Sequence, residues 1–373
     1  MAEAVLALSS CKRSDIMHVT MMYTLFSKSH RSSYIGRWLF IFAMLTGAQT
    51  SGVFAQNENH VFLKMQEQEL VPIAKDILNH DSSEYKFAIN KSFGKKLSEL
   101  LEMPGSFDYP FDSLITLSKI TPTDNTFRIF SWYIVDENKE HFYYGLIQRK
   151  FITASGADSL IVIPLHHTLD YSLDIENKVL DNKNWMGALY YKVITLKTKG
   201  KRRDFRTGNW IKENHTLYVL FGWNGSTVYS NFKMADVLTF DPRDNSRAIL
   251  GAPVFFFDPI PKYRAVFQYS DNSPFRLNVD KVKRKWPRKD LEMIIFDHLA
   301  PPNMSNKHEL YDYGADGSYD GLYYKKNRGG FFVFVKNVRV RDPKLDKYKP
   351  KEINKQSKAA YKKMKKTGLN IYK

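Results

Sequence analysis

Cysteine is almost absent from this sequence, because Cys11 is the only one among 373 residues. It lies within residues 1–55, the segment that we expect to be removed on export. The mature chain would then have no disulfide, no thiolate metal site and no cysteine nucleophile. A cysteine-free exported chain is compatible with a bacterial periplasm or cell surface. We therefore expect the fold to be held by its core alone.

The sequence also lacks the motifs of the common enzyme classes. It has no Gly-x-Ser-x-Gly elbow, no P-loop, no dinucleotide fingerprint and no His-Glu-x-x-His helix. We therefore expect a non-catalytic binding or structural module of the cell envelope. The alternative is a glycan or peptidoglycan hydrolase, since such an enzyme needs only two well-placed carboxylates and no sequence motif.

Long apolar runs are missing as well. The run from Trp38 to Leu45 follows a basic flank and is shorter than the ~20 residues that a membrane-spanning helix needs. Small and polar residues follow it, so residues 1–55 are typical of a cleavable export signal, with cleavage between Ala55 and Gln56. We expect the mature chain to have no transmembrane span and to be periplasmic, displayed on the cell surface or secreted. Translation is interpreted as starting downstream of Met1.

The net charge of +17 is unevenly distributed. Residues 341–373 contain 12 Lys or Arg and 3 Asp or Glu, so about half of the excess lies in this tail. Such a tail in a cytosolic protein would indicate nucleic acid, but export removes that partner. We expect the tail to be disordered and solvated, with binding to anionic envelope polymers or lipid headgroups as the alternative.

The remaining chain divides into a helical segment, 56–105, and a β-rich domain, 106–340. In the helical segment, Phe93, Leu97, Leu100 and Leu101 follow the spacing of one buried helix face, and Pro104 ends that helix. Asp81 and Glu84 have the spacing of a capping pair at its start.

Strands and turns dominate after this point. The segments 127–135 and 141–150 flank a turn, and so do 321–325 and 331–335, which predicts two hairpins. Strict alternation over 263–280 predicts a third hairpin, and Asn224-Gly225 predicts a tight turn in a fourth. We expect residues 230–238 to form a short helix. The fold class is therefore mainly β: an antiparallel, sandwich- or barrel-like body with two helices at its N-terminal end.

Several strings between residues 110 and 340 resemble a group of exported, uncharacterised proteins of Bacteroidetes-type bacteria. They are Leu220-Phe221-Gly222-Trp223-Asn224-Gly225, Lys233-Met234-Ala235-Asp236-Val237-Leu238, Gly251-Ala252-Pro253-Val254-Phe255, Met293-Ile294-Ile295-Phe296-Asp297-His298-Leu299 and Ser318-Tyr319-Asp320-Gly321. The resemblance implies export and a β-rich fold. It implies no activity and no catalytic residue.

Asp312, Asp316 and Asp320 lie in a glycine-rich segment. Carboxylates on such a segment can bind Ca²⁺, although their spacing of four is not that of an EF-hand loop. The alternative is a turn-rich connection in which Asp and Gly satisfy the backbone. We predict no cofactor, with Ca²⁺ at these carboxylates as the alternative.

Two histidine-containing pairs follow apolar strands. His166-His167 comes after 160–165, and Asp297-His298 comes after 291–296. If the two strand ends met, one imidazole from each could bind Zn²⁺ or act in acid–base chemistry. The alternative is that polar residues simply close two apolar strands.

Aromatic residues are plentiful and could form a saccharide-binding surface. Five tryptophans are candidates for it: Trp132, Trp185, Trp210, Trp223 and Trp286. The alternative is that these rings fill a β core.

Overall fold

The computed structural model describes residues 59–338 apart from 154, 169–173, 198–200, 204–208, 213–215, 226–228, 258–259, 283–290, 304–308 and 327–329. The chain divides into two units, Met1–Val61 and Phe62–Lys373, and the described strands all belong to the second. The expected export signal with its Ala55–Gln56 junction and the basic tail 341–373 lie outside the described residues.

Two helices begin the described chain, as predicted. Residues 59–79 are helical, and α3 spans Ser83–Glu102. The predicted capping pair is wrong, because Ser82 is the N-cap and its hydroxyl accepts the backbone N–H of Tyr85. Phe93 and Leu97 are buried on the predicted face of α3. Among the described residues, no helix is long and apolar enough to cross a membrane.

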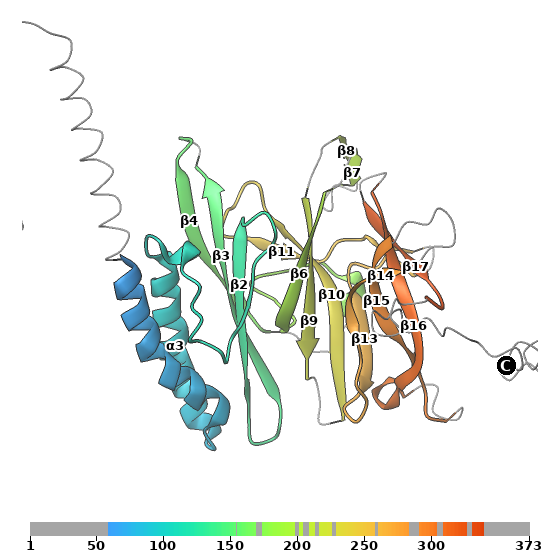
Figure 1. The fold of residues 1–373 in the computed structure, drawn as a ribbon, viewed down its shortest axis with the longest axis horizontal. Coiled ribbons are helices and arrows are strands. Elements are labelled where there is room, and N and C mark those ends of the chain that lie inside the picture. Colours follow the sequence, from blue (N-terminus) through green and yellow to red (C-terminus); the bar gives the residue numbers. More distant parts are fainter. Residues whose placement is uncertain are drawn as a thin grey trace, which may run out of the picture. The chain divides into compact units, whose positions relative to one another are not determined.

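The helices pack on one face of a four-stranded antiparallel sheet (Figure 1). Its strands, in spatial order, are β1 (Ser118–Ile120), β2 (Phe127–Val135), β3 (His141–Ile152) and β4 (Asp158–His166). The predicted β2–β3 hairpin is confirmed. Leu97 and Leu101 of α3 share one hydrophobic cluster with Phe130, Trp132 and Leu146 of the sheet.

A six-stranded antiparallel sheet covers the other face of the four-stranded sheet. Its strands are β5 (Leu180–Asp181), β6 (Leu189–Lys197), β9 (Thr216–Asn224), β10 (Ser230–Phe240), β11 (Ala248–Leu250) and β13 (Ala265–Ser270). The short strands β7 (Lys201–Arg203) and β8 (Trp210–Lys212) pair separately.

The helix predicted over 230–238 is wrong, because these residues form the central strand β10. Met234 and Leu238 pack into the core shared with the four-stranded sheet, while Ala235 and Val237 pack into the core on the opposite face. A strand that is buried on both faces has no polar alternation, and its apolar run resembles a buried helix.

A five-stranded sheet packs on the far side of the six-stranded sheet. Its strands are β12 (Phe255–Phe256), β14 (Leu277–Val282), β15 (Leu291–Ala300), β16 (Gly314–Lys325) and β17 (Phe331–Val335). The β12–β17 pair is parallel, and the other pairs in this sheet are antiparallel. The predicted β16–β17 hairpin is confirmed.

The predicted hairpin over 263–280 has the right strands and the wrong partners. β13 pairs with β10 in the six-stranded sheet, whereas β14 pairs with β15 in the five-stranded sheet. The predicted tight turn at Asn224-Gly225 is also wrong, because Asn224 belongs to β9 and pairs with Phe232. β9 and β10 nevertheless form a hairpin with a longer connection.

The unit is thus layered: helices, then the four-, six- and five-stranded sheets (Figure 1). The predicted mainly-β, antiparallel architecture is confirmed in its sandwich-like form, and the sheets do not close into a barrel. Among the described residues, three short 3-10 helices lie in the connections: Ser106–Asp108, Ile175–Asn177 and Leu310–Asp312.

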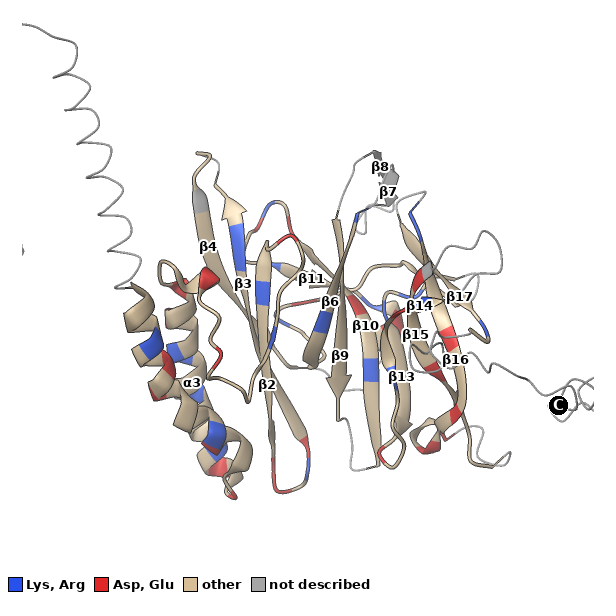
Figure 2. Cartoon of the chain, in the orientation of Figure 1, with Lys and Arg blue, Asp and Glu red and all other residues tan. Residues whose placement is uncertain are grey.

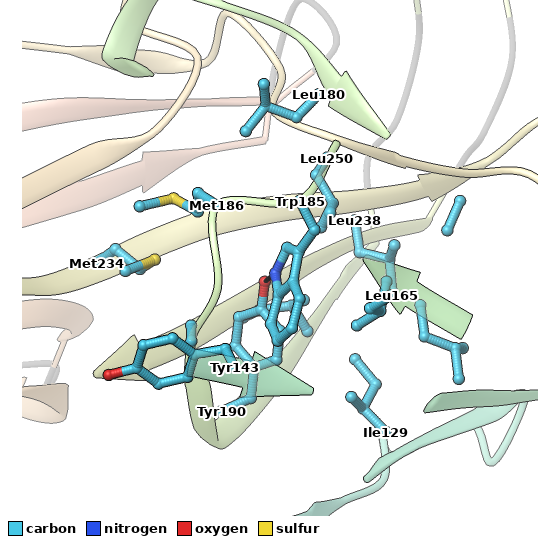
Figure 3. Packing of buried hydrophobic residues seen from close by; sticks show 14 of the residues in the cluster. Ile129, Tyr143, Leu165, Leu180, Trp185, Met186, Tyr190, Met234, Leu238 and Leu250 are labelled. Atoms are coloured by element: carbon cyan, nitrogen blue, oxygen red, sulfur yellow. Dashed lines mark hydrogen bonds between the residues drawn. The ribbon is translucent and has the colours of Figure 1, made fainter. Parts of the chain in front are cut away.

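Aliphatic and aromatic side chains together fill the core between the four- and six-stranded sheets (Figure 3). Trp185 and Tyr190 are fully buried, and the Trp185 indole N–H donates to the Tyr190 hydroxyl at 2.9 Å. The bond satisfies the polar end of a buried ring that would otherwise cost free energy. These two rings are therefore part of the core, in agreement with the alternative prediction that aromatic residues fill a β core.

Candidate functional site

The histidine pairs of the sequence do not meet. His166 ends β4 in the four-stranded sheet, and His298 lies in β15 of the five-stranded sheet. The six-stranded sheet packs between these two sheets. A zinc site or acid–base pair that combines His298 with His166 or His167 is therefore not assembled in this fold.

His167 is instead part of the packing at the end of β4. Its Nδ1 accepts the backbone N–H of Tyr143 at 3.4 Å, and its ring lies edge-on to the Tyr143 ring at 5.6 Å. Burial lowers the pKa of His167. Burial is also the largest of the effects on His141, whose pKa is lowered as well. Both imidazoles are thereby favoured in their neutral form, which suits ring packing.

His298 lies opposite a bulge in β16. Asp297 pairs with Tyr319 and Leu299 pairs with Ala315, so residues 316–318 oppose a single residue of β15. Gly317 has a φ of +83°, a conformation that glycine adopts without strain. The predicted turn-rich connection is thus a bulged strand, which brings two of the three predicted aspartates to His298.

His298, Asp316 and Asp320 form what we call the imidazole–carboxylate cluster. The Nδ1 of His298 lies 2.7 Å from Oδ2 of Asp320, and its Nε2 lies 4.0 Å from Oδ2 of Asp316. Asp320 is only 3% exposed, and its other oxygen accepts the backbone N–H of Asn337 at 2.8 Å. Both oxygens of the buried carboxylate therefore have partners inside the protein.

Asp316, which belongs to this cluster, and its neighbour Asp297 have pKa values shifted in opposite directions. Partial burial acts to raise the pKa of Asp316, but hydrogen bonds from the Ser318 hydroxyl and N–H, with the His298 charge, lower it overall. Partial burial raises the pKa of Asp297, against the opposing effect of the Arg276 backbone N–H.

The described part of the chain contains no group of three or more His, Cys, Asp or Glu side chains arranged to hold a metal ion. In the imidazole–carboxylate cluster, the imidazole stands between the two carboxylates instead of sharing a centre with them. Asp312 lies apart in sequence in the 3-10 helix Leu310–Asp312.

A groove of about 480 Å³ runs between α3 and strands β3 and β4. We call it the α3 groove. Its lining comprises Phe87, Asn90, Lys91, Gly94, Lys95 and Ser98 from α3, with Trp132, Tyr144, Gly145, Leu146, Pro164, Leu165 and His166 from the sheet. Aromatic, amide, hydroxyl and basic groups converge on it, a composition typical of ligand-binding sites.

The floor of the α3 groove is rigid. The indole N–H of Trp132 donates to Oδ1 of Asn90 at 2.7 Å, and Phe93 packs edge-on against the indole at 5.4 Å. Tyr144 stacks on Trp132 with a ring separation of 6.0 Å and an interplanar angle of 19°. Trp132 is 4% exposed, so Tyr144, which is half-buried, presents more of the aromatic surface.

A glycine of α3 lies next to this floor. Gly94 faces Trp132 from the middle of α3, and a Cβ there would sit 3.9 Å from the indole, in ordinary contact. Packing therefore does not require glycine at this position, although glycine costs a helix roughly 0.5–1 kcal/mol relative to alanine. The cost is consistent with a need for open space in the groove beside α3.

The charge of the α3 groove has one sign. Lys91, Lys95 and His166 are exposed, and none of the described residues that line the groove is Asp or Glu. Basic and acidic residues both occur along the helices, as Figure 2 shows, so the absence of acidic residues is specific to the described lining of the groove. Lys95 lies 3.9 Å from Glu99, but both side chains are mostly exposed and such pairs are weak.

Sequence reasoning found part of this groove. Trp132, predicted as a candidate for a saccharide-binding surface, and His166, predicted as a candidate for a zinc or acid–base site, both line it. Trp185 is core, and Trp223 is half-buried away from it. The side chain of Trp210 and all of Trp286 lie outside the described residues.

The contributions of α3 and of Tyr144 to the α3 groove were missed. The local signal that could have found them is a glycine in a helix interior beside two lysines at positions i and i+4, Lys91 and Lys95.

Comparison with family models, with curated proteins and with solved structures gives no match to this chain.

Proposed function

We propose that this protein is a non-catalytic binding module of the bacterial cell envelope, exported by its N-terminal segment, and that its ligand lies in the α3 groove. The observation that carries the proposal is the groove itself, about 480 Å³ in volume, with a rigid aromatic floor and convergent polar groups. Pre-formed concave sites of this composition and size are typical of ligand binding.

The same lining argues against the alternative hydrolase. Glycoside hydrolysis needs two carboxyl groups on either side of the scissile bond. None of the described residues that line the α3 groove carries a carboxyl group. The His298–Asp320 pair lies in the five-stranded sheet, on the far side of the six-stranded sheet, and cannot serve this groove.

Titration of the purified chain with envelope components tests the proposal. We expect saturable binding to at least one saccharide among peptidoglycan fragments, neutral oligosaccharides and uronic-acid oligosaccharides, with the ligand recovered intact by chromatography. Failure of every component to bind would contradict a saccharide-binding module. Shortening of the recovered ligand would favour the hydrolase.

Gly94→Ala locates the ligand without damaging the fold. The added methyl group occupies the groove 3.9 Å from the Trp132 indole, so we expect affinity to fall by about fivefold, equivalent to ~1 kcal/mol. Thermal stability should rise, because alanine is favoured over glycine in a helix by ~0.5–1 kcal/mol. Tyr229→Ala, at a tyrosine that is 75% exposed outside the groove lining, is the control and should bind normally. Unchanged affinity in Gly94→Ala would place the ligand elsewhere.

A further inference from the structure

The α3 groove presents two cations in a row. Lys91 and Lys95 are four residues apart on α3, so they lie on one helix face, ~6 Å apart along the axis. His166 approaches from β4 on the sheet side of the groove. A ligand in the groove therefore meets positive charge that no lining carboxylate among the described residues offsets.

The floor between these charges suits a saccharide ring. Tyr144 offers an aromatic face on which the C–H face of a sugar can stack, and the buried Trp132 indole supports it. Asn90 and Ser98 also line the groove. Because the Asn90 carbonyl oxygen accepts the Trp132 indole N–H, its amide nitrogen is the end that remains for a ligand oxygen.

The use of lysine in place of arginine indicates which acidic group the ligand carries. Phosphate sites often add arginine forks or the N–H groups at a helix N-terminus to lysine point charges. The described lining of the α3 groove has no arginine, and it runs along residues 87–98, inside α3, which begins at Ser83. Lysine acts as a point charge without a demand for paired geometry, which suits single carboxylates spaced along a chain.

We infer that the α3 groove binds an acidic saccharide, a chain of uronic-acid type, with a ring on Tyr144 and its carboxylates at Lys91 and Lys95. This assignment rests on the proposed function and names its ligand class. It is independent of the basic tail, which lies outside the described residues.

The test compares oligogalacturonate with its fully methyl-esterified form, since the two share rings and length and differ in charge. In calorimetric titrations of the full chain, we expect the acid form to bind roughly tenfold more tightly at low salt, a difference of ~1.4 kcal/mol. The difference should shrink as salt is added, because exposed charges are screened.

Two variants separate the charges from the platform. Lys91→Gln combined with Lys95→Gln should remove the preference for the acid form and leave binding of the ester unchanged. Lys96→Gln, at an exposed lysine of the same helix that does not line the groove, should keep the preference. Tyr144→Ala should weaken both forms by a similar factor.

The outcomes distinguish this inference from the proposed function. Equal binding of acid and ester forms, or a preference that survives loss of both lysines, would overturn the acidic-saccharide assignment and leave a groove that binds neutral rings. Binding of peptidoglycan fragments alone would likewise overturn the assignment and keep the binding module. Absence of binding to any component would overturn both.

Discussion

The two polar regions of this protein differ in what their side chains already contact. In the imidazole–carboxylate cluster, both oxygens of Asp320 have protein partners, and both ring nitrogens of His298 face a carboxylate. In the α3 groove, Lys91 and Lys95 are exposed, and Asn90 holds only the floor in place. The first region is a closed network and the second is an open one.

This difference teaches where function is to be sought. A hydrogen-bonded histidine and aspartate resemble part of an active site. Their partners here lie inside the protein, so the pair links strands β15 and β16 to Asn337, which follows β17. A ligand needs groups without strong internal partners around a fixed shape. The α3 groove satisfies that condition, and the cluster does not.

The largest effect on this comparison is expected from Asp320→Ala. The change removes a 3% exposed acceptor and leaves the Asn337 N–H and the His298 imidazole without it. We expect a loss of about 3 kcal/mol in the free energy of unfolding, because two buried or charge-assisted bonds are lost together. Urea denaturation measures it. Groove binding by the folded variant should be unchanged, and a loss of binding would show that the two regions are coupled.

Trp132→Phe tests the other region and should cost less. The change removes the indole donor and leaves Oδ1 of Asn90, which is 5% exposed, without its 2.7 Å bond. We expect a loss of ~1–2 kcal/mol in stability and weaker saccharide binding. The control is the double variant Trp132→Phe with Asn90→Leu, in which no polar group is left unpaired. If the double variant is less stable than the single one, the bond is not what holds the floor.

The hairpins show how far local signals reach. β2 and β3, and likewise β16 and β17, are joined by short connections, so their sequences alone identify both strands and partners. β13 and β14 alternate just as clearly, yet each pairs with a strand from another part of the chain. Alternation encodes a strand's faces and does not encode its neighbour.

The sites show the same limit. His298 and Asp320 were each predicted, but for different sites, because their contact depends on the register of β15 on β16 and on the bulge at Gly317. The α3 groove joins residues from positions 87 to 166, and no local pattern brings these together. Trp132 could be predicted as a candidate because its residue type suits a saccharide surface.

Gly317→Ala would show how much the bulge contributes. Gly317 has a φ of +83°, and a Cβ there would meet no atom within 4 Å, so the cost is purely one of backbone strain. We expect a loss of ~1 kcal/mol in stability. Gly156→Ala is the matched control, because Gly156 has a φ of +82° and equally open surroundings between β3 and β4. A larger loss for Gly317→Ala than for Gly156→Ala would show that the bulge also positions Asp316 and Asp320.

Asp316→Asn should have the smallest effect, and its pH dependence is the informative part. The pKa of Asp316 is lowered in the folded state, so its contribution to stability is present at neutral pH and is lost as the pH falls below about 4, through the folded-state pKa. We expect the variant to lose less stability than the wild type between pH 7 and that range, as measured by thermal unfolding.

Asp297→Asn provides a control of opposite sign. Partial burial raises the pKa of Asp297, so its ionised form is penalised in the folded state at neutral pH and the penalty is relieved on acidification. The asparagine oxygen can still accept the Arg276 N–H. This variant should therefore lose more stability on acidification than the wild type, and parallel curves for both variants would show that neither carboxylate is linked to folding.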